Sequence, residues 1–300
     1  MSPATYASSA ANSAGTGAGN ADGRPSVREG LVTLGPAALA LKSTLDATFD
    51  GWGRQDGARP MAYPPLMAVA DLNRVDYFTN FPHLAVLAGG LRAQAVAAGF
   101  PGEGPVEEVP DQHLLPARYV LPPAACYSVY FDLAGQSLAD TPRRISTVAT
   151  CFRREDHFDG LRRLLGFTMR EIVCVGGRED VLAHLAHYRG RLVEFAARLG
   201  LPVEVRPASD PFFDAGGARA LMQRLFPVKE EFVYNGSLAI ASVNFHRNFF
   251  GERLDIRTAG DGSYAFSGCV AFGLERWISA LGDHFGEGPD ALRVRIAHAD

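Results

Sequence analysis

The stretch TVATCFRREDHFDGLRRLLGFTMREIVCV, residues 147–175, decides the fold. β-Branched and aromatic residues alternate with small or polar ones over residues 145–155 and again over residues 165–175, which predicts two strands. Between them lies a charged segment that is rich in Arg and Asp and contains Gly160. We therefore expect a β-hairpin with a long charged loop.

Side-chain alternation predicts which residues of this hairpin share a face. Arg153 and Glu155 are two residues apart, and Phe167 and Glu171 are four apart, so each pair lies on one side of its strand. If the two faces coincide, the hairpin presents groups that can grip a phosphate, stack on a base and accept from an exocyclic amine. The same spacing also fits a surface hairpin with alternating charge and one buried Phe, so both interpretations stay open here.

A second cluster, SGCVAFGLERWISAL, occupies residues 267–281. Gly268 and Gly273 bracket an apolar strand that leads into a helix carrying Arg276. Glycine allows a ligand to approach the backbone closely, but it also serves ordinary packing. An Arg at the start of a helix is often simply solvated, so this cluster alone assigns no function.

The elements around these clusters predict an α+β fold. Apolar residues recur at helical spacing over residues 36–49 and 180–199, and a Pro-bearing extended segment occupies residues 58–67. Strands that cluster without regular β–α alternation favour an antiparallel sheet over a doubly wound one. Further strands are expected at residues 119–133, 202–206, 231–234, 238–244 and 254–257, and a last helix at 272–281.

Composition excludes several classes of protein. Of the 300 residues, 47% are hydrophobic, enough for a sizeable core. Lys and Arg total 29 against 33 Asp and Glu, so the basic surplus typical of nucleic-acid binding is missing. Four Cys residues are too few for a disulfide framework, which favours the reducing cytoplasm.

The chain contains no apolar run of 18 residues, so we expect no membrane span or anchor. Residues 1–29 are expected to form a disordered tail, because the stretch up to residue 23 is rich in Ala, Ser, Gly and Asn and lacks the pattern of a signal peptide. Residues 30–300 are expected to form one domain.

Taken together, the two clusters resemble the signature motifs of class II aminoacyl-tRNA synthetases. The residues that resemble motif 2 are Phe152-Arg153-Arg154-Glu155, then Arg163, Phe167 and Glu171 in the spacing R-x-x-x-F-x-x-x-E. Gly273-Leu274-Glu275-Arg276 resembles motif 3, and the helix before Pro64 and Pro65 is similar to motif 1, through which that family dimerises. The resemblance implies a class II antiparallel sheet flanked by helices, and a homodimer.

Within class II, the chain most resembles seryl-tRNA synthetases of the methanogen type, which bind zinc through Cys, Glu and Cys. This resemblance implies Cys126, Glu171 and Cys269 as zinc ligands, with one open position for the substrate amine. Spacing alone favours buried inert thiols, because ligands so far apart in sequence carry no local signature.

The resemblance also implies roles at an ATP site. It places Arg153 on the α-phosphate, Glu155 near the adenine amine and Phe167 against the ring. Arg163, followed by Leu164 in the same site, and Arg276 hold the outer phosphates, and Arg153 and Arg276 act as the catalytic pair. Mg²⁺ is expected to bridge the phosphates.

Three further residues, Glu230, Ser242 and Asn244, are candidates for contacts with substrate or nucleotide. Glu230 is a candidate nucleotide contact, although a solvated charged turn fits it equally well. Ser242 and Asn244, with Glu171, are expected beside the amino acid, or are ordinary polar residues of a strand. Leu238 stands where the family carries an acidic residue, which casts doubt on the placement of the metal bound to ATP.

Seryl-tRNA synthetases begin with a long helical arm that clasps tRNA, whereas about thirty low-complexity residues precede motif 1 here. With the acidic net charge, this matches the bacterial amino acid:carrier-protein ligases. That family implies activation of glycine or alanine as an aminoacyl-adenylate, and transfer to the phosphopantetheine thiol of a carrier protein. The alternatives are an enzyme that charges tRNA and a non-catalytic paralogue that senses amino acid or nucleotide.

Overall fold

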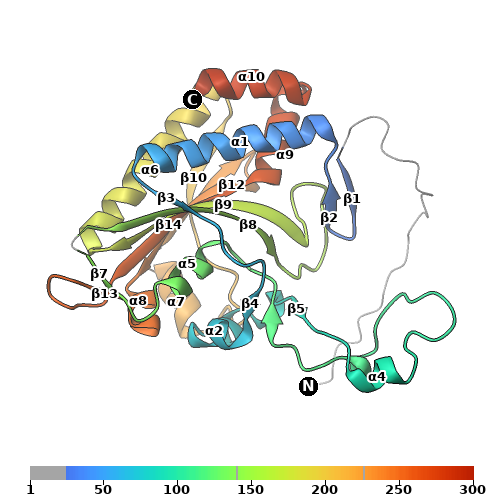
Figure 1. Ribbon diagram of the computed structural model, residues 1–300. Helices are drawn as coiled ribbons and strands as arrows, with labels where there is room; N and C mark the ends of the chain where they lie inside the picture. Colours follow the sequence, from blue (N-terminus) through green and yellow to red (C-terminus); the bar gives the residue numbers. More distant parts are fainter. Residues whose placement is uncertain (1–24, 140, 226) are drawn as a thin grey trace.

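The computed structural model describes residues 25–139, 141–225 and 227–300, and a seven-stranded sheet forms its centre (Figure 1). The strand order is β10-β11-β12-β14-β9-β8-β3. All neighbours pair antiparallel except β3 and β8, which confirms the predicted α+β class. The strands are β3 (Arg59–Met61), β8 (Arg143–Phe152), β9 (Gly166–Gly176), β10 (Val203–Ala208), β11 (Lys229–Tyr234), β12 (Leu238–Arg247) and β14 (Phe266–Gly273).

Long helices cover one face of this sheet (Figure 1). They are α1 (Pro36–Gln55), α6 (Arg178–Leu199), α9 (Leu274–Phe285) and α10 (Pro289–Ala299). The apolar stripes expected over residues 36–49 and 180–199 pack here. Phe49 stacks on Phe272 of β14 with ring centroids 4.0 Å apart, and Trp52 meets Phe195 edge-on at 5.1 Å. These fully buried rings form the centre of the larger hydrophobic core.

Polar contacts tie α1 to strand β9 within this layer. The Arg170 guanidinium donates to both carboxylate oxygens of Asp46 at 2.8 Å and to Asp50 at 3.1 Å. Glu275 accepts from the backbone N–H of Thr168 at 2.7 Å and pairs with Lys42 of α1 at 2.9 Å. Because Arg170 and Glu275 are both buried, removing either partner would leave a charge without compensation.

Shorter elements gather on the other face, where a second hydrophobic cluster packs against the sheet (Figure 1). The helices among them are α2 (Val69–Arg74), α3 (Tyr77–Asn80), α5 (Cys126–Asp132), α7 (Ala218–Leu225) and α8 (Phe249–Leu254). The remaining elements are α4 (Ala93–Ala97) and the short strands β1 (Ser26–Arg28), β2 (Leu31–Thr33), β4 (Met67–Ala68), β5 (Leu87–Ala88), β6 (Tyr119–Val120), β7 (Ser137–Leu138) and β13 (Arg257–Thr258). Among the described helices, none is both long and apolar enough to cross a bilayer.

Several predicted elements were wrong. The strand expected at 119–133 stops at Val120, and α5 begins at Cys126, because Pro122 and Pro123 interrupt the extended chain. At 254–257 the structure instead ends α8 at Leu254 and begins β13 three residues later, at Arg257. The helix expected at 272–281 begins at Leu274, since β14 continues to Gly273, and it is not the last one, because α10 follows it. Of the tail predicted at 1–29, residues 1–24 lie outside the described residues, and β1 begins at Ser26.

Candidate active site

Strand alternation brings the predicted substrate and metal residues to the face of the sheet opposite the long helices. Glu171 pairs in register with Ala271, which pairs with Ser242, which pairs with Glu231. Residues directly opposite in neighbouring strands point to the same side, so these side chains form one row across four strands. A parallel row runs from Cys269 through Asn244 to Lys229. Of the residues in these two rows, all but Glu231 line a cavity of about 420 Å³.

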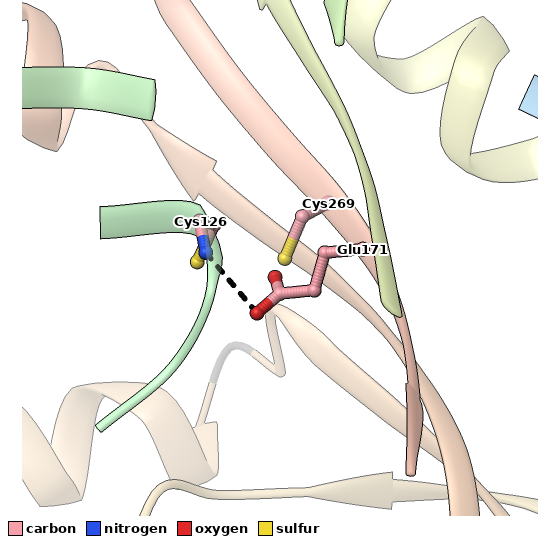
Figure 2. A group of neighbouring side chains, drawn as sticks. All are labelled: Cys126, Glu171 and Cys269. Atoms are coloured by element: carbon pink, nitrogen blue, oxygen red, sulfur yellow. Dashed lines mark hydrogen bonds between the residues drawn. The ribbon is translucent and has the colours of Figure 1, made fainter. Parts of the chain in front are cut away.

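Cys126, Glu171 and Cys269 meet at one end of these rows (Figure 2). They come from α5, β9 and β14, and all three are buried. One candidate ligand atom of each lies within 4.8 Å of the others. The Glu171 carboxylate accepts from the backbone N–H groups of Ala125 at 2.8 Å and Cys126 at 3.2 Å, which anchors it against the start of α5.

The chemistry of this cluster fits a divalent cation. A hydrogen bond with Cys269, burial and the Glu171 charge raise the pKa of Cys126 well above its usual range. The Cys126 hydrogen bond lowers the pKa of Cys269, but burial and Glu171 outweigh it and raise that pKa to about 11. Two thiols and a carboxylate crowded together in a buried place repel one another once ionised, and a cation relieves that repulsion. Two sulfur donors and one carboxylate are a set that suits zinc.

The hairpin loop brings the motif 2 residues together beside this cluster. The Arg153 guanidinium lies over the Phe167 ring at 5.2 Å, and its Nε donates to the Pro123 carbonyl at 3.1 Å. Arg163 pairs with Glu155 at 2.8 Å. Strand β8 ends at Phe152, so Arg153 and Glu155 lie just beyond the ladder. Leu164 is buried directly before β9.

Arg276, in the first turn of α9, faces the same hairpin loop. Its guanidinium donates to the backbone carbonyls of Arg162 at 2.9 Å and Ala239 at 3.1 Å. Burial lowers the pKa of Arg276, and the positive charge of Arg153 lowers it further. The structure thus brings both predicted catalytic Arg residues to one side of the sheet.

Glu230 is not brought to this site. Its partners in register are Pro207 and Val243, and Val243 belongs to the core under the long helices. Its carboxylate pairs with Arg189 of α6 at 2.8 Å. The prediction that Glu230 contacts the nucleotide was therefore wrong, because Glu230 lies on the helix-covered face of the sheet. Strand residues alternate, so the neighbouring Glu231 points to the site side instead.

Sequence reasoning missed Lys229, Asp210 and His246, which line the cavity. The Lys229 ammonium contacts Asp210 at 3.2 Å and Glu231 at 3.0 Å. Burial lowers the pKa of Lys229, but the two carboxylates outweigh the effect of burial, so the pKa is raised above its usual value. His246 follows Ser242 and Asn244 at the same two-residue interval, so extending the predicted strand by one such step would have found it.

Known proteins show a clear relationship to this chain. The family model "tRNA synthetase class II core domain (G, H, P, S and T)" matches residues 115–285. Two proteins of Bradyrhizobium diazoefficiens, "Amino acid--[acyl-carrier-protein] ligase 1" and "ligase 2", are 36% and 34% identical over 245 and 242 residues. These matches cover 76% of this chain in each case, and 72% and 70% of the relatives. The chain belongs to the amino acid:acyl-carrier-protein ligase family. It is therefore a ligase of the class II synthetase type.

Solved structures confirm the predicted class II fold of this ligase. M. kandleri SerRS, determined in complex with A. aeolicus tRNASec, superposes with a TM-score of 0.74 at 20% identity, over 89% of this chain and 57% of that one. Giardia lamblia prolyl-tRNA synthetase in complex with prolyl-adenylate gives a TM-score of 0.64 at 16% identity, over 85% and 48% of the two chains. The ligase thus spans less than two thirds of either synthetase chain.

Proposed function

We propose that this ligase activates glycine or alanine with ATP as an aminoacyl-adenylate and transfers the aminoacyl group to the phosphopantetheine thiol of a carrier protein. One observation carries the proposal: Arg153, whose guanidinium lies over the Phe167 ring, lines the same cavity as the buried Cys126, Glu171 and Cys269 cluster. The names of the Bradyrhizobium relatives support a carrier protein as the acceptor.

The nucleotide is assigned to the hairpin side of this site. Phe167 supplies a ring for the adenine, and Arg153, already held over that ring, supplies the positive charge for the α-phosphate. Glu155 accepts from the adenine amine, and Leu164 completes the apolar wall. Glu231, in place of Glu230, is the carboxylate that faces the nucleotide and its Mg²⁺.

Arg163 and Arg276 are assigned to the outer phosphates. In the structure Arg163 pairs with Glu155, and Arg276 holds backbone carbonyls of the loop, so both guanidinium groups exchange partners when ATP binds. Their charge stabilises the pyrophosphate that leaves when the amino acid carboxylate attacks the α-phosphorus. Such electrostatic stabilisation is the main source of catalysis in phosphoryl and nucleotidyl transfer.

The amino acid is assigned to the row of side chains on β12 and β9. Cys126, Glu171 and Cys269 would hold Zn²⁺, which would supply a Lewis-acid site for the substrate amine. Ser242 and Asn244 lie next to this cluster in the sheet and are placed to donate hydrogen bonds to the substrate. A pocket that holds the amine and the carboxylate in this way orients the nucleophile without a general base.

In the second step the pantetheine thiol attacks the carbonyl carbon of the adenylate. A thioester bond forms, the bond to phosphate breaks, AMP leaves, and the thiol proton passes to the phosphate or to solvent. We further propose that the protein acts in the cytoplasm, and as a homodimer through α1 and the segment that follows it.

The test uses purified protein with radiolabelled glycine, alanine or serine, ATP, Mg²⁺ and Zn²⁺. Parallel reactions contain holo carrier protein, apo carrier protein or tRNA, and a panel of amino acids is first ranked by pyrophosphate exchange. We expect exchange with glycine or alanine and label on holo carrier protein alone. Label on tRNA alone would refute the acceptor, and absence of exchange with every amino acid would identify a non-catalytic paralogue.

A further inference from the structure

Strand β12 is irregular at His246, beside the candidate metal ligands. Phe245 pairs with Gly268 and Arg247 with Ser267, so His246 is an extra residue that opposes no partner in β14. Arg247 follows with a φ of 54°, in the left-handed region that non-glycine residues rarely adopt. Bulges of this kind re-aim a side chain and are common next to active sites. The bulge and the left-handed residue cost conformational free energy, so the contacts of His246 are expected to compensate for it.

The His246 imidazole contacts a candidate ligand with one nitrogen and two buried hydroxyls with the other. Its Nε2 lies 3.9 Å from the Cys269 sulfur, and its Nδ1 lies 3.1 Å from the Tyr130 hydroxyl and 3.5 Å from the Ser267 hydroxyl. Tyr130 is fully buried and stacks on Phe250 at 3.9 Å, and the imidazole meets the same Phe250 edge-on at 5.2 Å. Packed rings therefore fix the plane of the imidazole.

The Cys269 sulfur decides the direction of these hydrogen bonds. A metal-bound thiolate only accepts, so Nε2 carries the ring proton that faces it, and Nδ1 accepts from the Tyr130 or the Ser267 hydroxyl. Asn244 donates to the same sulfur through Nδ2 at 3.5 Å. One strand thus supplies two N–H donors to a single sulfur atom.

His246 is not one of the clustered ligand residues. Within the part of the chain that the structure describes, the group with ligand atoms inside 4.8 Å consists of Cys126, Glu171 and Cys269. His246 approaches Cys269 without joining that group. Residues in this relation to a metal orient the ligand and adjust its basicity, and their loss typically weakens metal binding 10- to 100-fold.

We propose that His246 is a positioning residue of the metal site, which donates its Nε2–H to the Cys269 sulfur in the tautomer that the Tyr130 and Ser267 hydroxyls stabilise. The inference rests on the zinc site of the proposed function. It assigns the bulge and the left-handed Arg247 a role: they turn the imidazole toward the sulfur. It also makes Tyr130, which is not one of the clustered ligands, a determinant of metal affinity.

The experiment measures the zinc dissociation constant of the purified full chain by competition with a chromophoric chelator. The variants are His246→Leu, His246→Gln and Tyr130→Phe, each checked for native circular dichroism. We expect a loss of about 10- to 100-fold for His246→Leu, because the donor is removed. Gln retains an N–H near the position of Nε2 and should recover most of the affinity, while Tyr130→Phe should fall between wild type and His246→Leu.

His184→Leu is the matched control. His184 is also a buried histidine, but its Nε2 faces the Ile172 carbonyl at 3.3 Å in the helix-covered layer. We expect this variant to keep wild-type zinc affinity whatever its stability.

Two results would overturn the inference: unchanged zinc affinity in His246→Leu and Tyr130→Phe, or complete loss of zinc in His246→Leu and His246→Gln, which would make the imidazole a direct ligand. Wild-type protein that binds no zinc would refute the metal site itself, and with it any role of His246 there. Cobalt substitution provides a second readout, because the sulfur-to-cobalt absorption band should shift in His246→Leu but not in His184→Leu. If His246→Leu fails to fold, the Gln and Phe variants still decide the question.

Discussion

Glu171→Gln separates the two roles of this buried carboxylate. The Gln carbonyl oxygen can still accept from the N–H groups of Ala125 and Cys126, which Glu171 Oε1 contacts at 2.8 and 3.2 Å. Two such bonds are worth about 2 kcal/mol together. We therefore expect metal-free Glu171→Gln to unfold at nearly the wild-type temperature, and Glu171→Ala to lose about 2 kcal/mol or more.

The rise in melting temperature on adding zinc should distinguish wild type from Glu171→Gln. At free zinc 100-fold above its Kd, a ligand that binds only the folded state stabilises it by about 2.7 kcal/mol. For a domain of this size that raises the melting temperature by roughly 4–5 °C. Glu171→Gln replaces an anionic ligand with a neutral amide, so we expect it to show almost none of this rise.

The assay is thermal unfolding followed by intrinsic fluorescence, with and without zinc, together with elemental analysis. Glu179→Gln is the matched control, because Glu179 is exposed on α6, far in sequence from the candidate ligands, and pairs with the adjacent Arg178. A Glu171→Gln protein with wild-type zinc content and a wild-type thermal shift would refute the assignment of Glu171 as a ligand.

Three more predictions concern the nucleotide, the sheet and the pH dependence of stability. Arg153→Ala should lower the rate of amino acid-dependent pyrophosphate exchange about 10²- to 10³-fold, and a rate within twofold of wild type would contradict its role at the α-phosphate. Gly268→Ala should lower the free energy of unfolding in urea by about 1–3 kcal/mol, because a Cβ would lie 2.9 Å from the Asn244 carbonyl oxygen. Gly190→Ala, where a Cβ meets nothing within 4 Å in α6, should raise it by about 0.5–1 kcal/mol, and equal effects at the two glycines would be inconsistent with this steric argument. Burial lowers the pKa of His184 from 6.5 to about 4, so the unfolded chain binds a proton that the native protein excludes, and stability falls as the pH falls through that window. His184→Gln should flatten this fall by at most about 1.4 kcal/mol per pH unit in urea titrations, and an unchanged slope would exclude His184 as the cause.

The sheet and its helix-covered face followed from local patterns in the sequence. The alternation in residues 145–155 and 165–175 predicts β8 and β9 to within about three residues at each end. The stripes in residues 36–49 and 180–199 predict the buried side of α1 and α6, because a 3.6-residue repeat places all of their apolar side chains on one side of the helix. The strand predicted at 119–133 was wrong because two prolines divide one apolar run into elements of different type. Periodicity alone cannot distinguish a short buried helix from a strand.

The site was only partly accessible from sequence. Alternation shows that Glu230 and Glu231 lie on opposite faces, but not which of Phe232 and Val233 turns toward the long helices. In the structure Phe232 does so, and Glu231 therefore lies on the opposite face of the sheet, the one that carries the candidate site. Lys229 and Asp210 are joined across a loop, and no spacing rule connects residues that meet only through tertiary packing.

The adjacent residues Arg170 and Glu171 give strand β9 an unusual intolerance to changes in length. Arg170 holds α1 on one side of the sheet, and Glu171 reaches the cysteines on the other. Deleting or inserting a single residue before them would exchange the two faces, burying the carboxylate under α1 and turning the guanidinium toward the thiols. A change of two residues would restore the alternation. Natural or engineered indels in this hairpin are therefore expected to be confined to its loop, or to occur in even numbers within the strand.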